Sequence, residues 1–354
     1  MRSNNKYFQK SKKIPIDKFF LDVLYNKKFG YYSCQYPFDK KGDFVTAPSI
    51  SFLFSEMIAI WLVSCWISFK KPNNFNIIEL GPGNGELSKI LHKTIKKFPD
   101  VYKSSNFYLY EKSNFLKNIQ KKKLINKKFQ WISSFEKIRK GPTIFIGNEF
   151  FDAIPIKQFT RKKGVIFEEH VFLNKKNKIE RIHIKAKPKE IKELKKFSIL
   201  DKIRFIEFPK LGLKLLKTIT KKIKKSNGGI LLIDYGYIEQ NNYNTLQSVR
   251  KHKKNNIFFN LGNADVTSLV NFTLLKNFFK KEKLSVKNVV TQSFFLKKIG
   301  IINRAEILST KMSFKEKSDL YFRLKRLLSS SHMGELFKVI FACKATKTKI
   351  IGFD

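Results

Sequence analysis

The sequence of 354 residues has little of what several protein classes require. Its three cysteines, Cys34, Cys65 and Cys343, lie far apart and form no Cys-x-x-Cys pair. Such spacing supports neither a disulfide framework nor a zinc site, and it is typical of a reducing compartment. The five histidines are equally scattered, without the spacing of a metal site or of a Ser-His-Asp triad. The sequence therefore predicts no bound metal.

Long apolar runs are also missing. The longest apolar stretch, residues 50–69, contains four serines and one glutamate. A membrane-spanning helix needs about 18 or more consecutive apolar residues with almost no charge. We therefore expect a buried helix over this stretch and no membrane span. Residues 1–13 are basic and polar, without the apolar core of a secretory signal.

Arginine is scarce although the chain is strongly basic. The formal net charge is +44, but only nine of the 72 basic residues are arginine. Lysine, asparagine, isoleucine and phenylalanine, the residues of A/T-rich codons, are all abundant. We therefore interpret most of the charge as mutational bias of an A/T-rich genome. Specific readers of nucleic acids use the arginine fork for guanine and phosphate, so specific nucleic-acid binding is not expected.

A glycine-rich segment is the most informative part of the chain. An apolar run over residues 75–80 carries an acid, Glu79, near its end, and a helical pattern covers residues 87–95. Three glycines at alternate positions lie between them: Gly81, Gly83 and Gly85. A strand, a glycine turn and a helix form the first half of a nucleotide-binding unit, because glycine lets the backbone approach a ligand closely. The alternative is a purely structural turn.

The spacing of these glycines favours one kind of ligand. The dinucleotide fingerprint requires a glycine where this chain has Glu86, whose charge would repel a pyrophosphate. The pattern instead resembles the first motif of class I S-adenosylmethionine methyltransferases, whose cofactor has no phosphate. A second strand over residues 107–111 ends in Glu111, and an acid there suits hydrogen bonding to two ribose hydroxyls. A solvated carboxylate at the strand end is the alternative for Glu111.

Strands that alternate with helical patterns predict a parallel, doubly wound sheet. Further strands of this sheet are predicted over residues 129–132, 143–147 and 228–236. The pattern changes over residues 157–209, with two hairpin strands (165–167 and 170–172), a lysine-rich helix or loop (185–196) and one more strand (201–209). The last two strands are predicted over residues 291–296 and 336–341, the final one antiparallel.

Seven short motifs occur along the chain in a family order: residues 42–48, 79–85, 147–155, 234–236, 245–250, 264–267 and 333–338. Together they resemble the MidA-type family of class I S-adenosylmethionine methyltransferases, which includes the mitochondrial complex I assembly factor that methylates an arginine. The resemblance extends over residues 14–344. The family pattern has arginine, glutamate, a small or hydroxyl residue and aspartate at four positions where this chain has Asn84, Ser49, Glu86 and Asn271.

The resemblance implies a fold and a domain organisation. The fold is the α/β class I S-adenosylmethionine-methyltransferase fold, a Rossmann-like doubly wound sheet with its last strand antiparallel, an N-terminal helical lid and an α+β insertion. Residues 1–13 are expected to be a flexible basic N-terminus and residues 14–72 the lid. The methyltransferase core then comprises residues 73–156 and 228–345, and residues 157–227 are the insertion.

The resemblance also implies a function. It is protein-arginine N-methylation with S-adenosyl-L-methionine in the assembly of respiratory NADH dehydrogenase (complex I), a subunit of which would be the protein substrate. One alternative is an RNA methyltransferase, which the charge suggests. Another is a non-catalytic assembly chaperone that retains the methyltransferase fold. The expected compartment is the cytoplasm of a bacterium, or the mitochondrial matrix of a eukaryote, and the sequence defines no oligomeric state.

Carboxylates are the expected catalytic groups. An arginine guanidinium is always charged, and carboxylates that grip its fork would orient one nitrogen toward the methyl group. Glu149 and Asp152 follow the fourth core strand, where ligands bind in such sheets, so they are the predicted catalytic residues. The alternative is that Asp152 caps a helix and Glu149 pairs with a lysine.

Other site residues are predicted at neighbouring strand ends and loops. The predicted cofactor-binding residues are Glu79, Gly81, Gly83, Gly85, Glu111, Asp43 and Thr46. The predicted substrate-binding residues are Asn148, Asp234 and Tyr235. A helix cap is the alternative for Asp43 and Thr46, and a cap at the start of a helix is also the role expected for Asp265 and Thr267.

Overall fold

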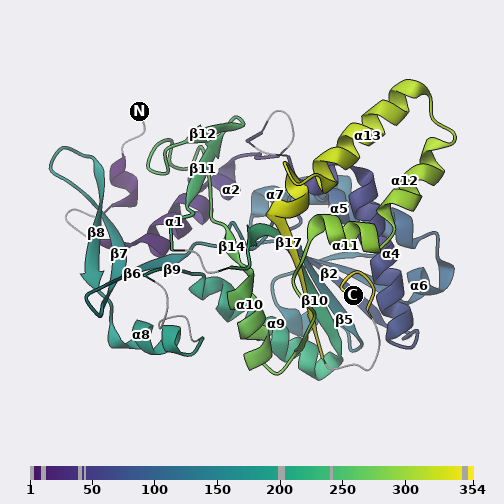
Figure 1. Cartoon of the computed structure of the whole chain (residues 1–354), viewed down its shortest axis with the longest axis horizontal. Coiled ribbons are helices and arrows are strands. Elements are labelled where there is room, and N and C mark those ends of the chain that lie inside the picture. The colour runs from purple at the N-terminus through teal and green to yellow at the C-terminus, as the bar shows by residue number, and fades with distance from the viewer. Residues whose placement is uncertain are drawn as a thin grey trace. The chain divides into compact units, whose positions relative to one another are not determined.

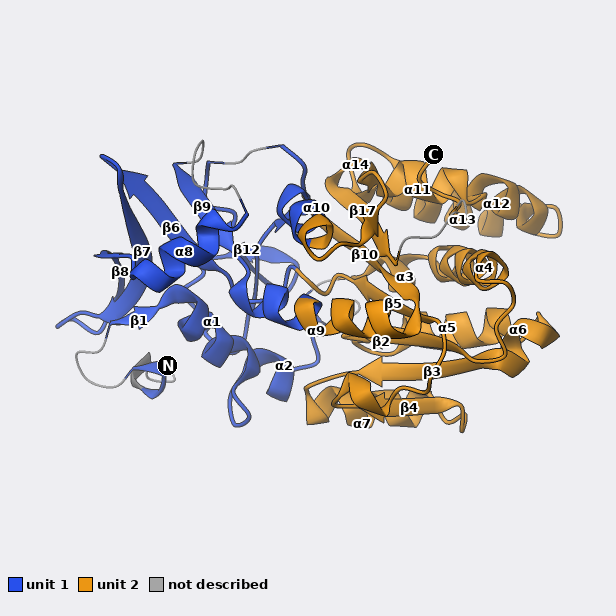
Figure 2. Cartoon of the chain, turned by 90° about the horizontal axis from the view of Figure 1, so that it is seen from below, with its two compact units in different colours: residues 1–44, 152–216, 237–278 blue, residues 45–151, 217–236, 279–354 orange. Residues whose placement is uncertain are grey.

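The computed structural model describes residues 4–8, 13–38, 42–43, 45–197, 204–239, 242–344 and 350–354. The chain forms two compact units (Figure 2). Unit 1 comprises residues 1–44, 152–216 and 237–278, and unit 2 comprises residues 45–151, 217–236 and 279–354. The glycine loop, Glu111 and Glu149 therefore belong to unit 2, whereas Asp43 and Asp152 belong to unit 1.

A mixed sheet of mostly parallel strands forms the centre of unit 2 (Figure 1). Its strand order is β15-β17-β10-β5-β2-β3-β4. The strands are β2 (Phe75–Leu80), β3 (Ser105–Tyr110), β4 (Phe129–Ile132), β5 (Thr143–Asn148), β10 (Gly228–Tyr237), β15 (Ser285–Val286) and β17 (Phe337–Cys343). β2 is buried along its whole length, as expected for a parallel strand covered on both faces.

The direction of the strands matches the sequence prediction. β2 is parallel to both β3 and β5, and β10 is parallel to β5. β17 runs antiparallel to β10, with Leu232 opposite Ile340. The predicted class I methyltransferase sheet with an antiparallel final strand is therefore confirmed.

Helices surround this sheet, and the apolar stretch over residues 50–69 forms one of them. It is α4 (Phe52–Ser68), which begins after Ser51, whose side chain accepts a hydrogen bond from the N–H of Leu53. Trp61 of α4 is fully buried among residues of the unit 2 core. Within the described residues, no helix is long and apolar enough to cross a membrane.

The other helices of unit 2 are shorter, apart from one that begins in unit 1. Before β5 they are α3 (Ala47–Ile50), α5 (Glu86–Ile95), α6 (Pro99–Ser104), α7 (Asn114–Lys123) and the 3-10 turn η2 (Phe135–Lys137). After it they are α9 (Lys210–Ser226), which begins in unit 1, then α11 (Gln292–Lys298), α12 (Ile301–Ser309), α13 (Phe314–Leu328) and α14 (Met333–Leu336). α4 packs against α5, the helix that follows the glycine loop.

Unit 1 is built on two antiparallel sheets. The larger has the order β1-β7-β6-β9 with β8 paired to β7, and the smaller has the order β12-β11-β13. Their strands are β1 (Ile14–Pro15), β6 (Lys157–Lys162), β7 (Val165–Leu173), β8 (Ile179–Lys185), β9 (Phe205–Phe208), β11 (Gln247–Arg250), β12 (Lys253–Asn255) and β13 (Asp265–Thr267). The remaining elements are η1 (Asn4–Tyr7), α1 (Ile16–Tyr25), α2 (Tyr31–Cys34), α8 (Pro188–Lys195), β14 (Val270–Asn271) and α10 (Phe272–Lys281).

The apolar face of α1 makes the core of unit 1. Phe19, Phe20 and Val23 are buried there together with Tyr7 and Phe8. Tyr7 and Phe8 fall within residues 1–13, for which the sequence predicts a flexible segment. Residues 1–3 and 9–12 lie outside the described residues.

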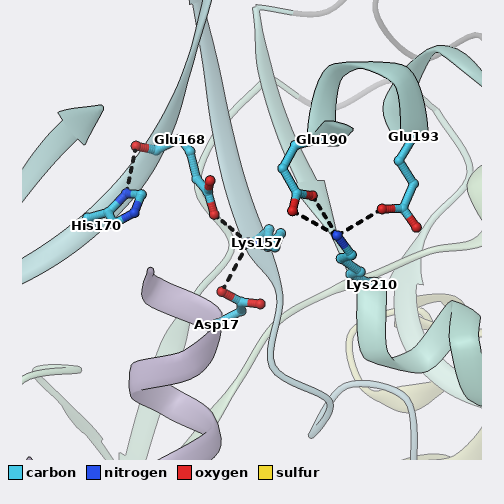
Figure 3. A network of polar contacts seen from close by, with 7 residues as sticks. All are labelled: Asp17, Lys157, Glu168, His170, Glu190, Glu193 and Lys210. Carbon is cyan, nitrogen blue, oxygen red and sulfur yellow. Dashed lines mark hydrogen bonds and ion pairs between the residues drawn. The ribbon is translucent and has the colours of Figure 1, made fainter. Parts of the chain in front are cut away.

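Buried ion pairs connect the elements of unit 1 (Figure 3). The Lys157 ammonium contacts the Glu168 carboxylate and lies 3.5 Å from Oδ1 of Asp17. All three side chains are at least nine-tenths buried, and burial raises the pKa of Asp17 although Lys157 opposes that shift. Beside them, Nζ of Lys210 lies 2.7 Å from Glu190 and 2.9 Å from Glu193. One buried cation therefore joins α1 to β6 and β7.

Two predictions of secondary structure are wrong. Residues 292–296 form part of helix α11 rather than a strand. Thr291 ends the short strand β16 (Val290–Thr291) and caps α11 by accepting a hydrogen bond from the N–H of Phe294. Residues 165–172 form one strand, β7, rather than a hairpin, because Glu168 and Glu169 are buried in ion pairs instead of standing in a turn.

The predicted strand over residues 201–209 is β9, and residues 201–203 lie outside the described part of the chain. The unit boundaries also differ from the predicted domain boundaries. The predicted lid (14–72) is divided after residue 44, and residues 237–278 of the predicted core belong to unit 1.

Candidate cofactor and substrate site

The glycine loop after β2 has a backbone that only glycine adopts readily. Gly81, Gly83 and Gly85 have φ angles of +62°, +54° and +78°. A Cβ atom on Gly81 would lie 2.7 Å from the ring of Phe150, so the loop has no room for a side chain there. Gly85 directly precedes α5, whose first N–H groups are not all satisfied within the helix. The loop thus presents bare backbone next to a helix N-terminus.

Glu79, near the end of β2, supports the glycine loop. Its carboxylate accepts a hydrogen bond from the hydroxyl of Ser88 in α5, and both side chains are buried. Burial raises the pKa of Glu79 to about 7, although the hydrogen bonds from Ser88 oppose the rise. The contact ties β2 to α5 and so fixes the two ends of the glycine loop.

Glu111 at the end of β3 is held through both carboxylate oxygens. Oε1 accepts the N–H of Ser113 at 2.8 Å, and Oε2 accepts Nε2 of Gln120 at 3.2 Å. Burial raises the pKa of Glu111, while these hydrogen bonds lower it. Gln120 also donates to the carbonyl of Gly83 at 2.9 Å. Gln120 is not among the predicted site residues, although it lies four residues after the buried Leu116 on the inner face of α7.

The end of β5 carries the first predicted catalytic acid, Glu149, in a strained backbone conformation. Its φ angle is +48°, which is unfavourable for a residue with a side chain. Oε1 of Glu149 accepts the N–H of Ala47 at 3.0 Å and Nδ2 of Asn148 at 3.2 Å. Its own N–H donates to the carbonyl of Ile233 in β10 at 3.0 Å.

Asp234 at the end of β10 is bound to backbone groups of unit 2. Oδ2 accepts the N–H groups of Phe150 and Phe151, and Oδ1 accepts the N–H of Tyr235. The ring of Tyr235 packs on Phe337, with ring centroids 5.6 Å apart. Asp234 therefore anchors the turn that contains Glu149.

Thr46 and Asp43 bind neighbouring groups of their own units. The Thr46 hydroxyl lies 3.5 Å from the Ser49 hydroxyl, and no side-chain hydrogen bond caps α3 at Thr46. In unit 1, Oδ2 of Asp43 accepts the Tyr31 hydroxyl at 2.6 Å, and Oδ1 accepts the N–H of Lys251. Phe44, which separates them in the motif, lies outside the described residues.

The second predicted catalytic acid, Asp152, lies near other acids within unit 1. It is buried, and its charge contributes to raising the pKa of Asp265 to about 7, an effect to which burial contributes most. Oδ1 of Asp265 accepts the Tyr32 hydroxyl at 2.9 Å. No described helix begins at Asp152, so it is not the cap considered as an alternative. The expected cap at Asp265 and Thr267 is also wrong, because these residues pair with β11 as strand β13.

The two predicted catalytic acids belong to different units, because the boundary falls between Phe151 and Asp152. Their joint action on one substrate group stays a prediction. Near the cofactor loop, the departures from the family pattern have local partners. Glu86 pairs with Lys123, and the Asn84 side chain accepts the N–H of Glu86. Among the described residues, no cluster of His, Cys, Asp and Glu could hold a metal ion.

The central part of the sequence matches a known protein family. The profile of the family described as "Putative S-adenosyl-L-methionine-dependent methyltransferase" matches residues 57–290. The chain belongs to this family. Its cofactor is S-adenosylmethionine, and the residues of unit 2 fit that group. Its glycine loop presents backbone groups without side chains, and the Glu111 carboxylate suits neutral hydroxyl groups better than phosphates.

Relatives of the chain share most of its length. The mitochondrial protein arginine methyltransferase NDUFAF7 of Xenopus tropicalis is 26% identical, covering 96% of this chain and 86% of its own. The Caenorhabditis elegans homologue is 30% identical over 78% of this chain and 70% of its own. A crystal structure from Burkholderia thailandensis, bound to S-adenosyl-homocysteine, covers 97% of this chain and 89% of its own with a TM-score of 0.81 at 20% identity. That likeness confirms the fold.

Proposed function

We propose that this methyltransferase transfers a methyl group to an arginine nitrogen of a protein. The relatives named protein arginine methyltransferase support this proposal. The observation that carries it is Glu149, an acid at the carboxyl end of β5 whose backbone is strained at φ +48°. Strained residues of this kind are concentrated at functional sites, because the surrounding structure must hold them there.

The proposed chemistry is an in-line displacement that depends mainly on placement. When bound, S-adenosylmethionine supplies a methyl group on a positively charged sulfur. Glu149 accepts N–H groups of the substrate guanidinium and orients one nitrogen. That nitrogen would form the new N–C bond as the C–S bond breaks, leaving neutral S-adenosylhomocysteine, and its surplus proton would pass to solvent. Asp152 is proposed to grip the same guanidinium, and Asn148, Asp234 and Tyr235 to line or fix the substrate edge.

The cofactor is proposed to lie over the glycine loop. Gly81, Gly83 and Gly85 would approach its amino-acid end with their backbone, while Glu79 holds the loop and Glu111 accepts the ribose hydroxyls. Asp43 and Thr46 are proposed to close over it. The substrate is proposed to be a subunit of respiratory NADH dehydrogenase. We further propose the mitochondrial matrix of a eukaryote, or the cytoplasm of a bacterium, as the compartment.

Mass spectrometry of respiratory subunits tests the arginine assignment. Methylarginine on a subunit should be present in cells with this gene, absent without it, and restored by the wild-type gene but not by a Glu149→Gln gene. Methylation restored equally by the variant would refute the role of Glu149. Unchanged methylarginine in the absence of the gene would refute the proposed function and leave RNA as the substrate to examine. Cofactor binding without any transfer would favour the chaperone.

A further inference from the structure

Gln120 is a buried amide that joins three parts of unit 2. Its side chain is 0% exposed and lies on the inner face of α7. Nε2 donates to the Gly83 carbonyl at 2.9 Å and to Oε2 of Glu111 at 3.2 Å. Oε1 accepts Nε1 of Trp131 in β4 at 2.9 Å. One side chain thus connects the glycine loop, the acid after β3 and the next strand of the sheet.

Trp131 decides which way the amide of Gln120 faces. An indole nitrogen can only donate a hydrogen bond, so it must meet Oε1 of Gln120. The Gly83 carbonyl and the Glu111 carboxylate can only accept, so both must meet Nε2. A reversed amide would place like groups together at all three contacts. The orientation of Gln120 is therefore fixed by its partners.

Gln120 also helps to fix the carboxylate of Glu111. The Ser113 N–H restrains one carboxylate oxygen, and Gln120 restrains the other. Each carboxylate oxygen has two lone pairs, so one hydrogen bond leaves it able to accept another. Gln120 also binds the middle glycine of the loop, so the direction of the carboxylate and the position of the loop are coupled.

We propose that Gln120 is a positioning residue that makes the cofactor site specific for the ribose hydroxyls. It acts by aiming the Glu111 carboxylate while holding the Gly83 backbone at a fixed distance from it. This inference rests on the proposed role of Glu111 as the acceptor of those hydroxyls. Gln120 acts through the Glu111 carboxylate and the Gly83 carbonyl, to both of which it donates.

Calorimetry with two probes tests the inference. The probes are S-adenosylhomocysteine and its 2′-deoxy analogue, which lacks one hydroxyl. Wild-type protein should bind the first about tenfold to a hundredfold more tightly, as expected for a hydrogen bond to a charged group. Gln120→Glu keeps the size of the side chain but loses both donors and sets a second carboxylate against Glu111. Its binding of S-adenosylhomocysteine should fall at least about tenfold, and the ratio between the probes should approach one.

Two further variants make the test specific. Gln130→Glu introduces the same charge at an exposed position of β4 and should keep both the affinity and the ratio. Trp131→Phe removes the indole donor that orients Gln120 and keeps an aromatic ring in its place, so it should lower the ratio while melting cooperatively. If Gln120→Glu does not fold, the affinity ratio of Trp131→Phe alone tests the inference.

The inference would be overturned if Gln120→Glu kept the wild-type ratio of affinities for the two probes. If that variant does not fold, the same ratio in Trp131→Phe would overturn it. Either result would leave the role of Glu111 intact. A wild-type ratio near one would overturn the ribose role of Glu111 and the inference with it. Neither result bears on arginine as the substrate, which the methylarginine measurement tests separately.

Discussion

The carboxylate of Asp234 accepts the backbone N–H of Phe151 at 2.8 Å, so the end of β10 fixes the turn that follows β5. The same oxygen accepts the N–H of Phe150 at 3.2 Å, and Asp234 is 1% exposed. Glu149, the residue before Phe150, owes its position to this anchor. We therefore predict that Asp234 acts on the reaction indirectly, through the backbone that carries Glu149.

Asp234→Asn should slow methylation more than it weakens cofactor binding. Aspartate accepts the N–H groups of Phe150, Phe151 and Tyr235 through two oxygens, whereas asparagine has only one acceptor oxygen. At least one N–H therefore loses a charge-assisted partner. The loss is about 1.5–3 kcal/mol, or roughly tenfold to a hundredfold in rate if it falls on the transition state. The methylation rate constant and the affinity for S-adenosylhomocysteine are measured for the variant and compared. Asp100→Asn, at an exposed position, is the control. Equal losses in both quantities would contradict the anchoring role.

Glu149→Gln should preserve the fold and the cofactor site but lose the substrate clamp. It keeps the shape of the side chain, yet a neutral amide binds a guanidinium more weakly than a carboxylate does. We expect the methylation rate constant to fall roughly tenfold to a hundredfold, with unchanged S-adenosylhomocysteine affinity. The assay uses the respiratory subunit found by mass spectrometry. Full activity in this variant would remove Glu149 from the mechanism.

Gly83→Val should abolish cofactor binding without unfolding the protein. Gly83 has φ +54°, where a β-branched side chain is strained, and its Cβ substituents would cover the backbone that the cofactor approaches. Calorimetry with S-adenosylhomocysteine measures the effect, and the melting temperature shows whether the variant folds. A folded variant with wild-type affinity would show that the glycine loop is only a structural turn.

The buried acid Glu79 should make stability fall as the pH rises. Burial raises the pKa of Glu79 from its ordinary value of 4.5 to about 7, so the folded state holds a proton that the unfolded state releases. Stability is then lost between about pH 4.5 and pH 7, on the order of 3 kcal/mol in total. Asp265 contributes with the same sign.

Glu79→Gln isolates this contribution. The variant can still accept from Ser88 but cannot ionise, so its advantage over wild type should grow from pH 5 to pH 8. Urea unfolding at both values measures it. A constant difference between the two proteins would show that Glu79 is already ionised in the folded state at pH 5.

Lys157→Met should destabilise the protein strongly. The substitution leaves the carboxylates of Asp17 and Glu168 buried without their shared cation, which typically costs about 3–5 kcal/mol. Lys162→Met, at the exposed end of the same strand, is the matched control. Denaturant unfolding compares the two. Adding Asp17→Asn and Glu168→Gln to Lys157→Met should restore part of the loss, and no restoration would argue against charge burial as its cause.

Local patterns allowed much of unit 2 to be predicted. The strand, glycine loop and helix around Gly81 are encoded within about twenty residues, and burial on both faces makes β2 and β10 largely apolar. The segment at Thr291 misled the prediction, because β-branched and aromatic residues that favour strands also suit a buried helix face. Its cap at Thr291 was the signal that was overlooked.

The contacts that position the site were beyond the reach of sequence patterns. Gln120 meets Trp131 and Gly83 only because α7 and β4 fold back on the glycine loop. Asp234 likewise bonds to residues more than 80 positions earlier in the chain. A sequence pattern shows which side chains face inward, but the hydrogen-bond partners of those side chains depend on the tertiary fold.

The left-handed backbone of Glu149 has a consequence for how this protein responds to selection. A non-glycine residue at φ +48° makes the folded protein less stable than glycine would at that position, by about 1 kcal/mol. A library of variants sorted only by heat resistance should therefore enrich glycine or asparagine at position 149. The same library sorted by methyl transfer should retain the acid. We therefore expect stability and activity to select for different residues at position 149, where this sequence has glutamate.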